Sequence, residues 1–101
     1  VLASIDAGAD RFDASIGGLG GCPYAPGASG NACTEEIVHA LELMGYDTGV
    51  DLEQVVAAAR ALPALIGHDT PSQIAKAGCR LDLHQPPADF AALRERALAR
   101  A

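Results

Sequence analysis

The sequence has no long apolar run and few basic residues. None of its hydrophobic segments approaches the ~20 consecutive apolar residues that a membrane-spanning helix requires. Seven Lys and Arg residues stand against 13 Asp and Glu residues, giving a formal net charge of −6. The basic residues are scattered, so no positive patch is available to follow a phosphate backbone. We therefore expect a soluble protein with neither a membrane nor a nucleic acid as partner.

The cysteines are also too few and too irregularly spaced for two common structural roles. Cys22, Cys33 and Cys79 are odd in number, which does not suit a framework of intramolecular disulfides. Their spacing lacks the closely paired ligands of a structural zinc site. A reducing compartment suits such thiols, and we predict a cytoplasmic location.

Glycine, in contrast, is concentrated in one stretch. Six of the eleven glycines fall within residues 17–30, where the sequence reads GLGGCPYAPGASGN from Gly18 to Asn31. Such density suits a backbone that turns tightly and approaches a ligand closely. The loop also carries a thiol, Cys22, between Gly21 and Pro23. We therefore expect the chemistry of this chain to lie in this loop.

The residues before the loop alternate between apolar and polar, as in a strand. Residues 11–16 place Asp13 and Ser15 on the polar side, where they face either the interior of a barrel or solvent at a sheet edge. Residues 49–50 predict a very short second strand. With the helices that follow, the order of strand, loop, helix, strand and helix predicts an α/β fold of about two βα units.

Four helices are predicted after the loop. Thr34 is expected to cap a helix over residues 35–44, and Asp51 with Gln54 forms a capping box before the next apolar stripe. Pro63 predicts a kink or break of that second helix near Leu62. Shorter helical patterns follow at residues 72–76 and, with one apolar side, at 89–101.

The glycine loop, Thr34-Glu35-Glu36 and the DTGVD sequence of residues 47–51 together resemble the hydroxymethylglutaryl-CoA lyases. These are divalent-metal-dependent (β/α)8 TIM-barrel enzymes that cleave a C–C bond. The resemblance extends to about Gly78, so we assign residues 1–78 to the C-terminal portion of such a barrel and residues 79–101 to a separate tail. A complete barrel needs about 250 residues, and the chain begins with Val1. It is therefore expected to be a C-terminal segment.

The resemblance also implies roles for particular residues. It makes Cys22 the catalytic residue, moving a proton to the enolate of the departing acetyl-CoA; a half-buried loop thiol is the alternative. Asn31 becomes a ligand of Mg²⁺ or Mn²⁺, with helix capping as its alternative. Glu35 would support the site from behind the ligands. Five further residues are implied to form the substrate loop: Gly20, Gly21, Gly27, Ser29 and Gly30.

The implied activity is cleavage of 3-hydroxy-3-methylglutaryl-CoA to acetyl-CoA and acetoacetate by an intact, homo-oligomeric enzyme. Related barrel lyases or Claisen-type synthases acting on another acyl-CoA or 2-oxo acid share the Gly-Asn-x-x-x-Glu pattern of residues 30–35. A non-catalytic remnant or interaction module is the alternative from another class. The family's His-x-His ligand pair is missing, Asp13 does not replace its first-strand aspartate, and His39 is expected at the surface. The segment alone should therefore be inactive.

Overall fold

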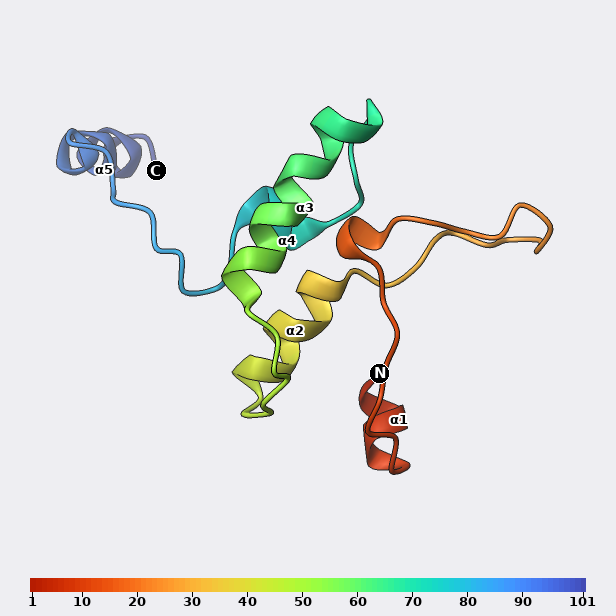
Figure 1. Ribbon diagram of the computed structural model, residues 1–101. Helices are drawn as coiled ribbons and strands as arrows, with labels where there is room; N and C mark the ends of the chain where they lie inside the picture. The colour runs from red at the N-terminus through yellow and green to blue at the C-terminus, as the bar shows by residue number, and fades with distance from the viewer.

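The computed structural model describes residues 1–101 and contains helices joined by long loops (Figure 1). The elements in chain order are α1 Leu2–Asp6, the 3-10 turn η1 Ile16–Gly18, α2 Thr34–Leu43, α3 Leu52–Ile66, α4 Gln73–Ala77 and α5 Phe90–Ala99. No strand is present. A single isolated parallel bridge pairs Ser15 with Cys33.

The body of the molecule forms where α2, α3, α4 and η1 pack together. Helical spacing gives α2 and α3 one apolar face each, and these faces meet. The buried apolar residues are Cys33, Val38, Leu41, Val56 and Ala59. Only 10 of the 101 residues are buried, so this core is small for the chain length.

Local capping signals set the boundaries of α3. The Asp51 carboxylate accepts the Gln54 backbone N–H at 3.1 Å and the Gln54 side-chain amide at 2.9 Å, which confirms the predicted cap. The helix ends at Gly67, whose φ of 80° is left-handed. The prediction was a kink or a break near Leu62, and the break does not occur, because α3 continues through Pro63. Proline removes one amide donor close to the helix end, and the Gly67 N–H closes the last turn on the Pro63 carbonyl at 3.0 Å.

Helix α2 starts one residue earlier than predicted and without a side-chain cap. Cys33 is its N-cap, and Thr34 is its first residue. The prediction that Thr34 caps the helix is therefore wrong. The Thr34 backbone N–H instead donates to the Ser15 carbonyl at 2.9 Å, so the first turn is held by a distant part of the chain.

Both predicted strands are absent from the chain as it stands. In residues 11–16 only Ser15 is paired: its N–H donates to Ala32 at 3.0 Å and its carbonyl accepts from Thr34. The segment that pairs with Ser15 is therefore residues 32–34, at the start of α2, and not residues 49–50. There the Gly49 N–H is bonded to the Asp47 side chain at 2.9 Å. Strands of a parallel sheet need neighbours on both sides, and this chain supplies only one pairing.

The C-terminal part of the chain is helical but separate from the body. The short helix predicted at residues 72–76 is confirmed as α4, capped by the Ser72 hydroxyl, which accepts the Ala75 N–H at 3.1 Å. The predicted final helix is confirmed as α5, but residues 81–101 are exposed throughout and α5 lies apart from the other helices (Figure 1).

The overall dimensions follow from this separation. The radius of gyration is 18.3 Å, whereas a compact domain of about 100 residues has one of about 13 Å. The extended tail and the projecting glycine loop account for the excess (Figure 1). None of the helices combines the length and hydrophobicity that crossing a membrane would take.

Candidate functional site at the base of the glycine loop

The glycine loop leaves the helical body and returns to it at nearly the same point. Its two arms run close together through residues 19–32 and project away from α2 and α3 (Figure 1). The parallel bridge between Ser15 and Cys33 closes the loop at its base. The site therefore has a fixed base, next to the body, and an exposed outer part.

On one side of this base, Glu35 connects α2 to η1 through hydrogen bonds. Its side chain is completely buried in the first turn of α2, and both carboxylate oxygens accept the Gly17 backbone N–H, at 3.0 and 3.1 Å. The positive end of the helix further favours a carboxylate at this position. Glu35 thus holds η1, where the loop begins, and makes no hydrogen bond to Asn31 itself.

On the other side, Asn31 connects the two arms of the loop through its side-chain amide. Its Nδ2 atom donates to the Leu19 carbonyl at 2.8 Å and to the Ser15 hydroxyl at 3.2 Å. A carbonyl oxygen can only accept, so the amide nitrogen must face Leu19 and Oδ1 points the other way. Asn31 bonds no amide of α2, which rules out helix capping as its role. Its oxygen remains available to an external partner.

Glycine is required where the two arms approach most closely. A Cβ atom on Gly20, which has a φ of +100°, would lie 2.6 Å from Asn31 Nδ2. A Cβ on Gly30, with a φ of +112°, would lie 3.1 Å from the Gly20 carbonyl oxygen. Both positions combine a left-handed backbone with a close approach, so any larger residue would disturb the placement of Asn31.

The other predicted loop residues lie farther out and are exposed. A Cβ atom on Gly21 would meet only Gly30, at an ordinary 3.7 Å, and Gly27 has open space where a Cβ would be. Ser29 and Cys22 are exposed as well. The structure thus brings Gly20, Gly30 and Asn31 together at the base and leaves the thiol on the outer part of the loop.

The three cysteines differ in accessibility. Cys22 is exposed, and its predicted alternative as a half-buried thiol is wrong. Burial raises the pKa of Cys33 to about 11, with the carboxylates of Glu36 and Glu35 adding to the rise. Burial and the nearby Asp82 also raise the pKa of Cys79. Of the three thiols, Cys22 is therefore the one that is open to solvent.

Ser15 is a site residue that the sequence only hinted at. Its place on the polar side of residues 11–16 was the available signal, and its hydroxyl does face Asn31. Asp13 is exposed and lines a different cavity. His39 is half-buried rather than fully exposed, and its Nε2 accepts the Arg80 backbone N–H at 3.0 Å. This bond places His39 in the packing of α2 against the residues after α4.

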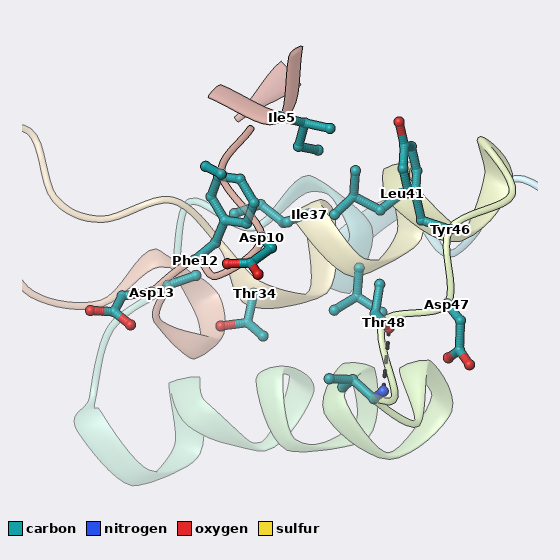
Figure 2. Close-up of a pocket in the computed structure, with 14 residues that line it drawn as sticks. Ile5, Asp10, Phe12, Asp13, Thr34, Ile37, Leu41, Tyr46, Asp47 and Thr48 are labelled. Carbon is teal, nitrogen blue, oxygen red and sulfur yellow. Dashed lines mark hydrogen bonds between the residues drawn. The ribbon is translucent and has the colours of Figure 1, made fainter. Parts of the chain in front are cut away.

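A cavity lies elsewhere, on the side of α2 facing α1. It has a volume of about 690 Å³ and is mostly apolar. Figure 2 shows Phe12, Ile37, Leu41 and Tyr46 around it. Neither Cys22 nor Asn31 lines this cavity. It borders the part of the apolar side of α2 that the other helices leave uncovered, and it is separate from the candidate site.

The chain contributes one candidate metal ligand and no complete metal centre. No group of three or more His, Cys, Asp or Glu side chains is arranged to hold an ion. The free Oδ1 of Asn31 suits a hard divalent cation, which prefers oxygen ligands. The residues present therefore fit one position of a metal site whose other ligands would have to come from outside this chain.

Comparison with known proteins connects this loop to a family. The family profile described as HMGL-like matches residues 1–62. The chain is similar to an HMG-CoA lyase from Acinetobacter baumannii, solved in complex with coenzyme A and 3-methylmalate. The two are 59% identical with a TM-score of 0.82, over 85% of this chain and 28% of that one.

Two curated relatives extend the comparison. The hydroxymethylglutaryl-CoA lyase YngG of Bacillus subtilis is 48% identical over 73 residues, which is 72% of this chain and 24% of the relative. The (R)-citramalyl-CoA lyase of Chloroflexus aurantiacus is 43% identical over 77 residues, 76% of this chain and 24% of the relative.

The chain spans about a quarter of the length of the curated relatives it matches. Its fold class is that of a TIM-barrel enzyme, of which these 101 residues form a mostly helical part without a closed sheet. The profile match over residues 1–62 covers more than half of the chain, and the similarity to the solved lyase extends over most of it. The chain therefore belongs to the HMGL-like family.

Proposed function

We propose that this chain provides the glycine-loop part of the active site of a carbon–carbon lyase that cleaves 3-hydroxy-3-methylglutaryl-CoA to acetyl-CoA and acetoacetate. One observation carries the proposal: the loop presents an exposed Cys22 beyond a base that turns the Asn31 oxygen outward. The similarity to a lyase solved with coenzyme A supports an acyl-CoA as the substrate. On this proposal residues 1–78 belong to the barrel and 79–101 form the tail.

Cys22 acts at the proton-transfer end of the reaction. A base outside this chain removes the proton of the 3-hydroxyl, and the bond between C2 and C3 breaks. Its electron pair passes to the thioester as an enolate, and acetoacetate leaves. The Cys22 thiol then donates its proton to the enolate carbon, giving acetyl-CoA. Exposure on a glycine-flanked loop gives the thiol the access that this transfer requires.

Asn31 contributes one oxygen to a divalent cation, Mg²⁺ or Mn²⁺. Such an ion, when bound, polarises substrate oxygens. What supports the role is the fixed amide of Asn31, whose nitrogen is fully used by Leu19 and Ser15. The remaining ligands come from the rest of an intact barrel, which we propose to be a cytoplasmic homo-oligomer.

A hybrid enzyme tests the proposal. The matching part of this chain would replace the aligned segment of the Acinetobacter baumannii lyase, and the hybrid would be assayed for acetoacetate release from 3-hydroxy-3-methylglutaryl-CoA. We expect measurable turnover, lost in the Cys22→Ser variant. A folded hybrid of correct oligomeric state with no turnover would contradict the proposal and favour the non-catalytic alternative.

A second substrate is favoured by the similarity to (R)-citramalyl-CoA lyase. The same hybrid would be assayed with (R)-citramalyl-CoA in parallel. A higher kcat/KM for that substrate would move the proposal to this related reaction without changing the roles of Cys22 and Asn31.

A further inference from the structure

The oxygen of Asn31 is useful as a ligand only if its amide group is prevented from turning over. An asparagine amide has a nitrogen and an oxygen of nearly equal size, and an exposed one rotates about χ2. In this structure both protons of Nδ2 have acceptors, the Leu19 carbonyl and the Ser15 hydroxyl. The two bonds therefore fix which end of the amide faces Leu19 and also fix the plane of the amide group.

The two acceptors have different parts in this arrangement. The Leu19 carbonyl decides which end faces inward, because the reversed amide would place Oδ1 against another oxygen at 2.8 Å. The Ser15 hydroxyl, 3.2 Å away, holds the second proton and so sets the plane of the amide. Gly20 leaves the space that the nitrogen occupies.

Ser15 is itself held more firmly than an ordinary loop serine. Its backbone N–H bonds to Ala32 at 3.0 Å, and its carbonyl accepts the Thr34 N–H at 2.9 Å. The two partners, Ala32 and Thr34, lie on either side of Cys33 in the returning arm, and Ala32 directly follows Asn31. The hydroxyl therefore belongs to a residue whose backbone is held by a short parallel pairing. The same pairing also sets the position of the Asn31 backbone.

We propose that Ser15 is a positioning residue that aims the Asn31 oxygen at the metal. The inference rests on the proposed role of Asn31 as a ligand. It adds that the hydroxyl of a residue 16 positions away in sequence determines the direction in which that ligand points.

The first test uses NMR on the 101-residue chain without metal. In the wild type both side-chain amide protons of Asn31 should be hydrogen-bonded and exchange slowly. In Ser15→Ala one of them should move to the shift of a free amide, whereas Ser15→Thr, which keeps the hydroxyl, should retain the wild-type signals. Ser4→Ala, which removes a serine hydroxyl in α1 that makes no side-chain bond, is the control. Free-amide signals in the wild type would overturn the proposal without any variant.

The second test measures Mn²⁺ binding to the hybrid enzyme by the loss of the free-ion EPR signal. A lost hydrogen bond of ordinary strength predicts that Ser15→Ala raises the Mn²⁺ midpoint about 5-fold, with Ser15→Thr close to wild type. Asn31→Ala should raise it further. If Asn31→Ala raises the midpoint and Ser15→Ala does not, the positioning role is wrong. If Asn31→Ala leaves it unchanged, the ligand assignment in the proposed function fails instead.

Discussion

The glycine loop and the C-terminal tail both extend from the helical body, but only the loop is fastened to it at both ends (Figure 1). At the base of the loop, Ser15, Glu35 and Asn31 form hydrogen bonds to residues 12 to 18 positions away in sequence. The hydrogen bonds after Asp82 join residues of the tail only to each other. The loop is therefore positioned by the body, whereas the tail beyond Asp82 is not.

The difference shows what a regular sequence pattern can and cannot do. The helical pattern of the tail is sufficient for α5 to form, but every residue of α5 is exposed. Its one ion pair, Arg96 with Asp89 at 3.8 Å, is solvent-exposed and adds little to stability. The loop has no regular structure and still holds Asn31 in one orientation. Order at the site comes from long-range hydrogen bonds rather than from secondary structure.

The largest effect should come from the outer part of the loop. In the hybrid enzyme, Cys22→Ser should lower kcat by roughly 10²–10⁴-fold, the usual contribution of a positioned proton donor, with substrate binding retained. Cys79→Ser is the matched control, because Cys79 lies beyond α4, and should keep activity within about 2-fold of wild type. Steady-state kinetics with both variants would check this, and near-normal turnover in Cys22→Ser would remove its catalytic role.

The next effect concerns the base of the loop. Glu35→Ala leaves the buried Gly17 N–H without its acceptor. Such an unsatisfied group costs about 1–3 kcal/mol, which thermal or urea unfolding of the chain would measure. Glu53→Ala, which removes an exposed first-turn carboxylate of α3, should change stability by less than about 0.5 kcal/mol. Equal losses in the two variants would show that the Glu35 contact is not what holds the loop.

The pH dependence of stability tests the burial of the Cys33 thiol. The folded state raises the pKa of Cys33 to about 11, so above pH 9 the unfolded chain loses this proton before the folded one does. Stability should therefore fall between about pH 9 and pH 11, by roughly 2 kcal/mol. The decline is measured as the difference between wild type and Cys33→Ala, which cancels the titration of other groups. Parallel curves for the two proteins would contradict the burial of this thiol.

The smallest effect should come from the tail. Removing residues 86–101 deletes α5, which has no buried residue, so the unfolding free energy of the remainder should change by less than about 0.5 kcal/mol. The Asn31 side-chain signals should also stay as they are. A clear loss of stability would mean that α5 packs on the body in solution, and the contrast between loop and tail would no longer hold.

The isolated 101-residue chain gives a further check. It offers one candidate metal ligand, and part of the apolar side of α2 is left uncovered around a cavity of about 690 Å³ (Figure 2). We expect no lyase activity, no tight binding of Mg²⁺ or Mn²⁺, and self-association. Calorimetric titration and an acetoacetate assay would test this, and micromolar metal binding with turnover would show that the chain holds further ligands.

The sequence predicted correctly several features that depend on nearby residues. Asp51 and Gln54 are three positions apart, so the cap of α3 follows from local geometry alone. The apolar stripes of α2 and α3 likewise fixed which helical faces meet. The motif of the glycine loop identified the family, since residues 18–31 preserve an unusual run of glycines around one cysteine.

The strands were not predictable in the same way. Alternation in residues 11–16 marks a segment that can pair, but pairing requires a partner, and within this chain the only partner is the residue before α2. The expected strand at residues 49–50 fails because the Asp47 and Thr48 side chains bond the local amides. Local hydrogen bonds satisfy those groups where no neighbouring strand does.

The sequence by itself thus determined the helices, the loop and the residues able to carry chemistry. Only the tertiary structure decided that Glu35 is buried against Gly17, that Asn31 does not cap α2, and that the Ser15 hydroxyl faces Asn31. These contacts join residues far apart in the chain. Their partners are therefore set by how the loop returns to α2, because a hydrogen bond forms only where folding brings donor and acceptor within about 3 Å of each other.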